Sequence, residues 1–239
     1  MKIINNLYLL SGSCFPAADS MDTLGDVYGI RSSSGIVLVD CGRAVTGLAM
    51  IKETLAYFNV KEPITHVIIT HAHHDHCGAA KELQEEGAVI IVGHEDAAYC
   101  ENGGVWGMYS PYDAEQAYPA FTPDITVAED QTLLLNDISF EFIKIPGHTP
   151  GSIAVRVEID NKIALFTGDA LQPDGLFLES ITFGWQGDPG FDKKAIVNSM
   201  MKLMKYETDM ILPGHGKICL RNGTKILRHA AQLAFSTMR

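Results

Sequence analysis

One short segment of the chain concentrates side chains that titrate and bind metal ions. Residues 67–80 read VIITHAHHDHCGAA, in which four histidines and one aspartate fall within six positions directly after an apolar run. The apolar run predicts a short buried strand, so the cluster begins where that strand ends. Because neutral imidazole is the commonest metal ligand in proteins, the cluster predicts a metal site.

Three further segments each place one potential ligand beside glycine at the expected end of a strand. They are IPGHTPGS with His148, LFTGDAL with Asp169 and ILPGHGK with His215. Glycine lets the backbone turn sharply and leaves room for a close approach. Any one of these residues alone would be ordinary turn chemistry. Together with the cluster, they predict a common site.

The spacing within the cluster indicates how its ligands could be divided between two ions. Residues i and i+2 of an extended segment point the same way, so His71 and His73 can bind one ion. Asp75 and His76 follow the expected turn and can face a second ion. The cluster alone therefore supplies two ligands to each of two neighbouring ions.

The three isolated residues can complete both groups. His148 can join the first ion and His215 the second, while the two carboxylate oxygens of Asp169 can bridge them. The prediction is two divalent ions with nitrogen and oxygen ligands, zinc first and iron or manganese as alternatives. Two adjacent ions lower the pKa of a shared water, so a bridging hydroxide can attack a carbonyl or a phosphorus atom. Asp75 is the predicted catalytic residue, which orients that nucleophile.

The rest of the sequence predicts the elements that must position these residues. Residues 101–125 show no clear period, whereas both halves of the chain mix strands with helices, which predicts sheets covered by helices. Strands are expected at 3–10, 27–31, 36–40, 67–70, 89–92, 133–135, 138–145, 153–159, 163–167 and 210–212, and helices at 45–58, 79–86, 193–204 and 223–237.

The two halves of the sequence echo each other. The first half has LVDCG after a hairpin and later HVIITHAH, and the second half has LFTGDA after a hairpin and later DMILPGHG. The echo sets Asp40 opposite Asp169 and His71 opposite His215. If both halves fold alike, the ends of their strands meet at one site.

Composition limits the partners and the location of the protein. The chain has 239 residues and a formal net charge of −11, so polyanions such as nucleic acids are unexpected partners. No apolar run approaches the ~20 residues that span a bilayer, and the N-terminus is a poor signal peptide. Five cysteines without a CxxC pair fit reduced thiols. We expect one cytoplasmic domain over residues 1–239, no membrane association, and leave the oligomeric state open.

These residues together carry a family resemblance. HxHxDH at 71–76, with His148, Asp169, His215 and the earlier Asp40, resembles the metallo-β-lactamase fold superfamily along essentially the whole chain. The resemblance implies an α/β fold, a four-layer αββα sandwich with a dinuclear site at one edge between the sheets. It implies the same ligand roles as above. It also implies that Asp40 is not a ligand but orients a ligating imidazole.

Differences from the family pattern indicate which branch of the superfamily the chain resembles. The commonest metallo-β-lactamases carry cysteine at the position of Asp169, whereas glyoxalase II carries the same bridging aspartate. Only 23 residues follow Gly216, so we expect the branch without the helical C-terminal domain of glyoxalase II. Short glyoxalase-like hydrolases have Gly-Arg where this chain has Gly184-Trp185, which counts against a glutathione thioester. Acyl-homoserine lactonases often have a tyrosine soon after the bridging aspartate, whereas residues 170–172 of this chain read ALQ. This difference weakens, without excluding, the expectation of lactonase activity.

The predicted activity is metal-dependent hydrolysis of an ester, thioester or lactone of a small molecule. One alternative is an oxidoreductase like the persulfide dioxygenases, which use one iron held by two histidines and one aspartate. Another is amide hydrolysis of the β-lactamase type. A nuclease is disfavoured because the chain is acidic and lacks a basic stretch.

Aromatic residues in two predicted loops are candidates for binding the substrate. Trp106, Tyr109, Phe183 and Trp185 lie in loops 101–125 and 171–190, which contain no lysine or arginine. Such loops favour an uncharged apolar acyl or aromatic substrate. The identity of the substrate stays open.

Overall fold

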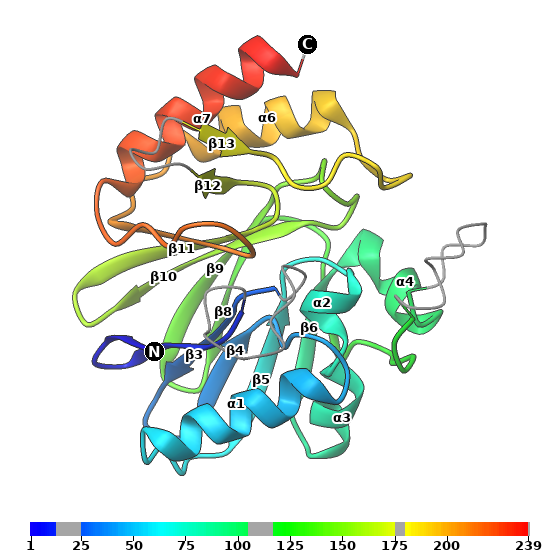
Figure 1. Cartoon of the computed structure of the whole chain (residues 1–239), viewed down its shortest axis with the longest axis vertical. Coiled ribbons are helices and arrows are strands. Elements are labelled where there is room, and N and C mark those ends of the chain that lie inside the picture. Colours follow the sequence, from blue (N-terminus) through cyan, green and yellow to red (C-terminus); the bar gives the residue numbers. More distant parts are fainter. Residues whose placement is uncertain (13–24, 105–116, 175–179, 239) are drawn as a thin grey trace.

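The computed structural model describes residues 1–12, 25–104, 117–174 and 180–238, and its centre is a pair of β-sheets packed face to face (Figure 1). The first sheet has the strand order β1-β2-β3-β4-β5-β6-β7. Its strands are β1 (Lys2–Ile4), β2 (Leu7–Ser11), β3 (Val27–Arg31), β4 (Ile36–Val39), β5 (Ile64–Ile69), β6 (Val89–Gly93) and β7 (Ile125–Val127). Neighbours from β1 to β4 are antiparallel, and neighbours from β4 to β7 are parallel.

The second sheet has the order β14-β11-β10-β9-β8, and only the β11–β14 pair is parallel. Its strands are β8 (Gln131–Leu135), β9 (Ile138–Lys144), β10 (Ile153–Ile159), β11 (Lys162–Gly168) and β14 (Met210–Pro213). The short strands β12 (Gln172–Asp174) and β13 (Ser180–Thr182) pair with each other in a separate small sheet.

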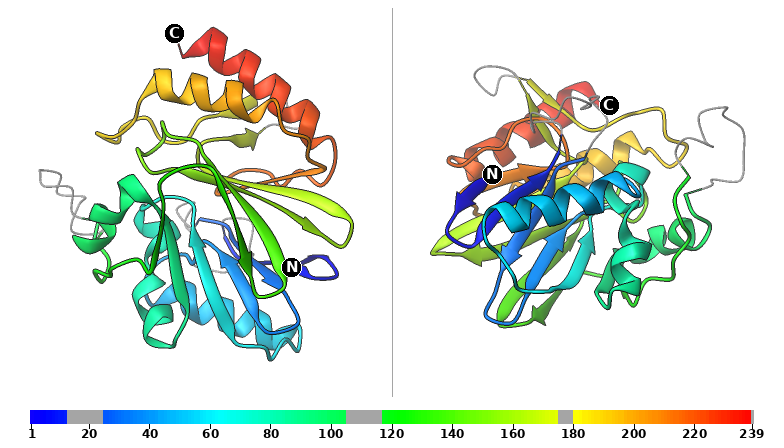
Figure 2. Two further views of the ribbon diagram at one scale, coloured as in Figure 1. Left: turned by 180° about the vertical axis from the view of Figure 1, so that it is seen from behind. Right: turned by 60° about the horizontal axis from the view of Figure 1, so that its bottom comes forward.

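Helices cover the outer face of each sheet. In Figures 1 and 2, α1 (Thr46–Tyr57) and α3 (Ala80–Glu85) cover the first sheet, and α6 (Lys193–Leu203) and α7 (Gly223–Thr237) cover the second. Short helices α2 (His74–Cys77), η1 (His94–Asp96) and α4 (Ala97–Glu101) follow β5 and β6. The order of layers is helix, sheet, sheet, helix, which confirms the predicted αββα sandwich.

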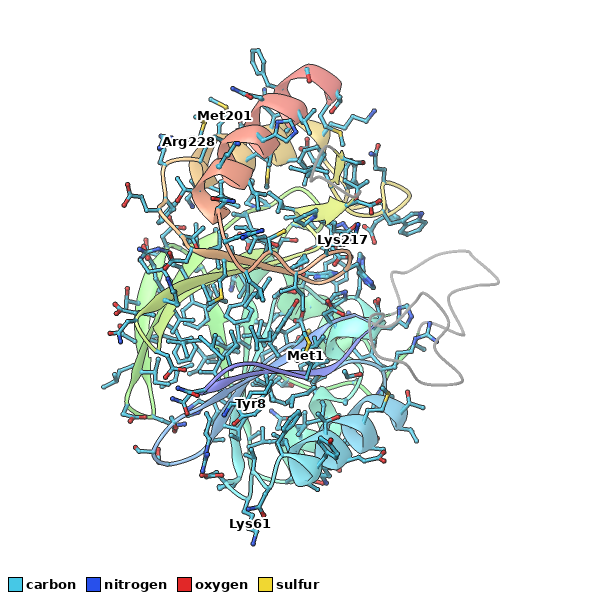
Figure 3. The ribbon with its side chains drawn as sticks, turned by 60° about the vertical axis from the view of Figure 1, so that its left-hand side comes forward. Met1, Tyr8, Lys61, Met201, Lys217 and Arg228 are labelled. Atoms are coloured by element: carbon cyan, nitrogen blue, oxygen red, sulfur yellow. The ribbon has the colours of Figure 1, made fainter. Side chains whose placement is uncertain are left out.

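Each interface between layers has its own hydrophobic core. In β4, Ile36 and Leu38 face the helices, whereas Val37 and Val39 face the other sheet. Successive side chains of a strand point to opposite faces, so a strand that is buried on both faces must be apolar throughout. A third core joins the second sheet to α6 and α7. Figure 3 shows side chains filling these layers, with Lys61 and Met201 marking opposite outer sides.

Several elements differ from the sequence-based expectation. The strand expected at 3–10 is two strands, because Asn5-Asn6 turns the chain between β1 and β2. Helix α4 and strand β7 lie at the borders of the segment 101–125, and β12 and β13 lie in the segment 171–190. Each of these strands has only three residues, so its pairing depends on a tertiary neighbour rather than on a local pattern.

Within the ranges that the structure describes, no helix is long and apolar enough to cross a membrane.

Candidate metal site

The topology brings four predicted site residues to one edge of the sandwich. Asp40 follows β4 and His71 follows β5, and these two strands are parallel neighbours. Asp169 follows β11 and His215 lies just after β14, which are the parallel neighbours of the second sheet. Because parallel strands end at the same edge, the echo between the two halves reflects two similar strand pairs whose carboxyl ends meet.

The cluster after β5 combines an extended segment with a single helical turn. His73 has extended backbone angles and precedes α2, which starts at His74. The rings of His71 and His73 lie 4.6 Å apart between centroids, as expected for residues i and i+2 on one side of an extended chain. The turn into α2 then brings Asp75 and His76 to the same edge, where both are buried.

The structure brings together all seven predicted metal ligands. Their side chains form three overlapping groups, and within each group the ligand atoms lie within 4.8 Å of one another. The groups are His71, His73 and His148; His71, His76 and Asp169; and Asp75, His76 and His215. The first and third groups are the two halves of the predicted site, and Asp169 lies in the group that adjoins both. Which ion each residue binds stays a prediction.

Several ring nitrogens face each other at short distances. His73 Nδ1 lies 3.1 Å from His148 Nε2, and His76 Nε2 lies 3.3 Å from His215 Nε2. His215 Nε2 also lies 3.0 Å from Asp75 Oδ2. Two imidazole lone pairs at such a distance repel each other unless a proton or a cation lies between them. Each contact therefore needs either a shared proton or a cation, and a cation at each end of the site would satisfy it.

Unpaired buried atoms point to the same conclusion. Among the described residues, His71 Nε2 and Asp169 Oδ1 face the site and are buried without a hydrogen-bond partner. A buried polar group left unpaired costs about 1–3 kcal/mol, so two at one site need an explanation. Nitrogen and oxygen donors of this kind fit divalent ions such as zinc. The residues present thus fit a metal centre.

The electrostatics differ between the two ends of the site. Burial lowers the pKa of His71 well below its usual value, and burial lowers the pKa of His148 to about 4. Burial would also lower the pKa of His76, but the carboxylates of Asp75 and Asp169 outweigh it and raise that pKa to about 10. His71 and His148 of the first group are therefore neutral imidazoles, whereas the other end is rich in negative charge.

Asp40 supports the histidines from behind. Its carboxylate accepts hydrogen bonds from the Thr70 backbone N–H at 2.7 Å and the Thr70 hydroxyl at 2.8 Å. Asp40 Oδ2 also lies 2.8 Å from His76 Nδ1, and Thr70 Oγ1 lies 3.1 Å from His71 Nδ1. These contacts leave Nε2 of both imidazoles facing the site, which supports the prediction that Asp40 orients a ligand. Its φ of 59° is in the left-handed region, where strain tends to mark functional positions.

Asp188 is a site residue that the sequence analysis missed. Its Oδ2 lies 2.9 Å from Nε2 of His73, and its side chain is 5% exposed. The contact leaves His73 Nδ1 to face His148, as Asp40 does for Nε2 of His76. Asp188 is 115 residues away from His73 in a glycine-rich loop, so no local spacing pattern could have revealed it.

Asp96 is a second missed residue, and it holds two ligand segments together. Its buried carboxylate accepts hydrogen bonds from the Ala72 N–H at 2.9 Å, the Thr149 hydroxyl at 2.7 Å and the Gly151 N–H at 2.7 Å. Ala72 lies between the first two predicted ligands, and Thr149 directly follows His148. Asp96 therefore fixes the two segments of the first group relative to each other.

The predicted substrate-binding residues have different environments. Trp106 and Tyr109 lie outside the described residues. Phe183 is 2% exposed and packs in the core beneath α6 and α7, a placement that favours a packing role for it. Trp185 is 63% exposed, in the loop whose Gly184 backbone adjoins His148.

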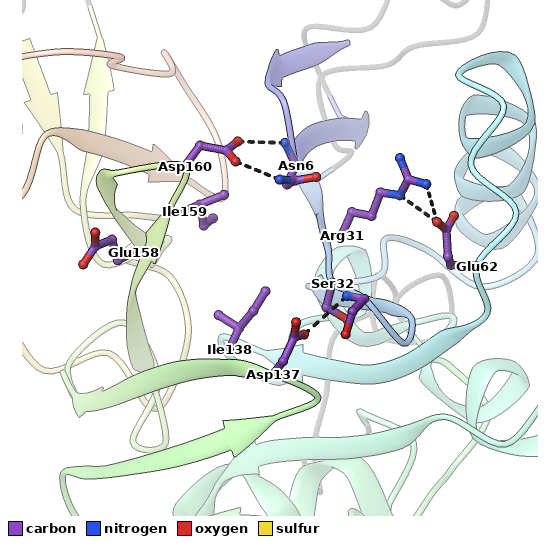
Figure 4. Close-up of a pocket in the computed structure, with 10 residues that line it drawn as sticks. Asn6, Arg31, Ser32, Glu62, Asp137, Ile138, Glu158, Ile159 and Asp160 are labelled. Carbon is purple, nitrogen blue, oxygen red and sulfur yellow. Dashed lines mark hydrogen bonds and ion pairs between the residues drawn. The ribbon is translucent and has the colours of Figure 1, made fainter.

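A polar hollow of about 470 Å³ lies at the opposite edge of the sandwich (Figure 4). It is formed where β1–β2, β3–β4, β8–β9 and β10–β11 turn, and none of the seven predicted ligands lines it. Figure 4 shows several of its charged groups paired, Arg31 with Glu62 and Asp160 with Asn6. The size of this hollow therefore does not indicate where the chemistry takes place.

Comparison with known proteins identifies the family. The model of the metallo-beta-lactamase superfamily matches residues 22–215, so the chain belongs to this superfamily. The hydroxyacylglutathione hydrolase GloC of Haemophilus influenzae is 31% identical over 159 residues, covering 63% of this chain and 68% of that protein. The probable metallo-hydrolase YflN of Bacillus subtilis is 27% identical over 238 residues, covering 86% and 87%.

Solved structures share the fold. A subclass B3 metallo-beta-lactamase of Bradyrhizobium japonicum superimposes with a TM-score of 0.72 at 23% identity, covering 99% of this chain and 90% of that one. At this identity the likeness shows the fold alone. The family binds divalent metal ions, and the cluster described above supplies candidate ligands for them. Family and cluster together fit a metal-dependent hydrolase that acts on small molecules.

Proposed function

We propose that the protein holds two divalent ions, zinc first, and hydrolyses an ester, thioester or lactone of a small molecule. One observation carries the proposal: seven nitrogen and oxygen donors converge at one sheet edge in overlapping groups, and some of their buried atoms lack a partner in the described structure. A structural cluster of hydrogen-bonded histidines would have no such unpaired atoms.

The proposed assignment follows the groups of the structure. His71, His73 and His148 would hold the first ion, and Asp75, His76 and His215 the second. Asp169 would serve both ions, since its Oδ1 lies 3.5 Å from His76 Nε2 and its Oδ2 lies 3.7 Å from His148 Nε2 and 3.6 Å from His215 Nε2.

When bound, such ions lower the pKa of water and polarise a substrate carbonyl. The protein's own groups hold and move protons around that chemistry. Asp40 and Asp188 accept from the outer nitrogens of His76 and His73, so each imidazole is kept in the tautomer that turns a lone pair inward. Burial would raise the pKa of Asp75, but His76 and His215 outweigh it and lower that pKa. Asp75 is therefore ionised, and we assign it the task of accepting a proton and returning it to the leaving group.

The substrate class rests on the relatives and on the loop that carries Trp185. A relative named hydroxyacylglutathione hydrolase supports an acyl substrate. However, residues 171–190 contain no lysine or arginine, and Trp185 stands where short glyoxalase-like hydrolases have an arginine. An exposed indole beside the site favours an apolar acyl or aromatic group over an anion.

The test combines metal analysis with a substrate panel. Untagged protein resupplied with zinc should contain about two ions per chain and should turn over an ester, a thioester or a lactone in preference to a β-lactam. His148→Ala should lose metal and activity, whereas the matched control His94→Ala, an exposed histidine outside the groups, should lose neither. One iron per chain with oxygen-dependent turnover would establish the oxidoreductase alternative instead.

We also propose a cytoplasmic location and a single domain over residues 1–239. The four cysteines within the described ranges, Cys41, Cys77, Cys100 and Cys219, are free and buried, which fits a reducing compartment. Limited proteolysis that releases no stable fragment would support the single domain.

A further inference from the structure

The loop from Gly184 to Asp192, here called the 184–192 loop, lies directly on the first ligand group. A Cβ at Gly184 would lie 2.4 Å from His148 Nδ1 and 2.8 Å from the carbonyl oxygen of Asp169. Its φ of 71° also favours glycine. At its other end, the Asp192 N–H donates to the Gly147 carbonyl at 2.8 Å, one residue before His148. Both ends of the loop thus contact the segment that carries His148, one through close packing at Gly184 and one through a backbone hydrogen bond at Asp192.

Asp188 makes the third and central tie. Its Oδ2 lies 2.9 Å from His73 Nε2, while its Oδ1 accepts the Gly190 N–H at 2.6 Å. Its backbone carbonyl accepts the Phe191 N–H at 3.0 Å. One carboxylate therefore holds the turn of the loop with one oxygen and the imidazole of a predicted metal ligand with the other.

Trp185 lies between two of these contacts, at Gly184 and at Asp188. A Cβ at Gly187 would lie 2.3 Å from Trp185 Cζ2, so the indole packs on the backbone at Gly187, next to Asp188. The ring is nevertheless 63% exposed. Its position depends on the turn that Asp188 holds rather than on a pocket of its own.

We propose that Asp188 is a positioning residue that couples the first metal ion to the placement of Trp185. The coupling rests on the proposed function for the ion at His73. An ion on Nδ1 draws electron density from the ring and makes Nε2–H a stronger donor to the carboxylate. The tighter hydrogen bond then holds the 184–192 loop, and with it Trp185, which follows the Gly184 that adjoins His148. The ion thus raises the affinity of the site for a substrate that contacts Trp185. By thermodynamic reciprocity, such a substrate raises the affinity of the first group for the ion by the same factor.

Tryptophan fluorescence tests the coupling without any substrate. The chain has two tryptophans, so in a Trp106→Phe background Trp185 is the only one. Metal-free protein is titrated with zinc ion while bound metal is measured in parallel by competition with a chromophoric chelator. We expect the emission of Trp185 to change as the first group fills.

Two substitutions separate the coupling from simple support of the loop. Asp188→Ser keeps a short acceptor for the Gly190 N–H but cannot reach His73, so the emission change should disappear. Zinc affinity of the first group should fall about 10–100-fold, as for other residues that support ligands. Asp188→Glu keeps both carboxylate oxygens as acceptors and should restore the emission change, at least in part. Far-UV circular dichroism confirms that each variant is folded, and if Asp188→Ser fails to fold, the emission change in Asp188→Ala decides.

The outcomes distinguish this proposal from the proposed function. An unaltered emission change at full zinc occupancy in Asp188→Ser overturns the coupling, even if the protein is an active hydrolase. Loss of the emission change in Asp188→Ser supports the coupling. If the parent protein then turns over no substrate of the panel, the hydrolase proposal alone is overturned. With an active substrate, Asp188→Ser at saturating zinc should raise KM several-fold with a smaller change in kcat, because placement of Trp185 affects binding more than chemistry.

Discussion

Asp40 and Asp169 occupy the same place in the two halves of the molecule, yet their carboxylates have different partners. Each follows a strand whose parallel neighbour leads to a predicted histidine ligand. The carboxylate of Asp40 is fully engaged by Thr70 and His76. In the described structure, Oδ1 of Asp169 has no hydrogen-bond partner and lies 3.5 Å from His76 Nε2, among the nitrogens of the predicted ligands.

The neighbouring strand explains the difference. Thr70 precedes His71, and its N–H and hydroxyl both capture Asp40. The corresponding residue before His215 is Gly214, whose N–H donates to the Gly168 carbonyl instead. A Cβ at Gly214 would lie 2.3 Å from Asp169 Oδ1. The missing side chain therefore both frees the carboxylate and leaves room for it.

The comparison teaches that the neighbouring residue, and not the aspartate, decides whether the carboxylate is engaged by the scaffold or left open. A threonine at the end of the adjacent strand turns the carboxylate into an acceptor for the scaffold. A glycine there leaves the carboxylate available to a cation. Four predictions test this comparison.

The largest effect is expected for Asp169→Ala. If this carboxylate serves both ions, kcat/KM should fall more than about 100-fold, beyond the range of about 10–100-fold for residues that only support ligands. Metal analysis should show fewer ions per chain. Asp40→Asn is the paired variant, and an equal or greater loss of metal in Asp40→Asn would contradict the comparison.

Gly214→Ala tests the space rather than the carboxylate. Gly214 is not among the described glycines with a positive φ, so alanine acts through its Cβ, which meets Asp169 Oδ1 at 2.3 Å and His76 Cε1 at 2.6 Å. We expect about a 100-fold loss of zinc affinity, measured by chelator competition. The control Gly29→Ala meets the Leu10 side chain at 2.7 Å and Ile36 Cγ2 at 3.6 Å, neither of them in the site, and should leave zinc affinity unchanged.

Thr70→Val removes the hydroxyl from the supporting half and leaves its N–H in place. The hydroxyl contacts both Asp40 and His71, so zinc affinity should fall by about 10-fold, at the lower end of the range for such support. Thr54→Val is a matched control, because Thr54 is also a buried threonine with a bonded hydroxyl but lies away from the site. Equal losses in both variants would show a general packing effect.

The smallest effect on the site is expected from a third buried aspartate. Burial raises the pKa of Asp26 to about 7, and its Oδ1 has no hydrogen-bond partner within the described part of the chain. A carboxyl whose pKa is raised by folding binds its proton more tightly in the folded state. The free energy of unfolding therefore falls as pH rises from about 4 to about 7 and then levels off.

Asp26→Asn should remove that decline. Relative to the parent, the metal-free variant should gain stability on the order of 2 kcal/mol at pH 8 and little at pH 4, measured by urea unfolding. Metal content should stay unchanged. A difference between variant and parent that is the same at both pH values would show that Asp26 is ionised in the folded protein.

The site residues that could be predicted from the sequence were those that a local spacing pattern reveals. HxHxDH and the three glycine-flanked ligands could be found because each begins within four residues of a strand end, and the apolar runs revealed those strands. Asp188 and Asp96 could not be found, because their roles arise from contacts across 115 residues and across 24 to 55 residues. The same limit explains why the sequence could not separate the environments of Phe183 and Trp185. Both are aromatic and two residues apart, and only packing makes one buried and the other exposed.

The second ligand group has a consequence for how the chain folds. Asp75 and His215 are separated by 140 residues, and they meet only after β14 has paired with β11. Contacts between such distant residues form slowly, because the intervening chain must first be ordered. An ion at this group thus binds only a molecule whose final strand is docked. Zinc should therefore slow unfolding far more than it speeds folding, so that the proposed metal centre would also stabilise the finished fold kinetically.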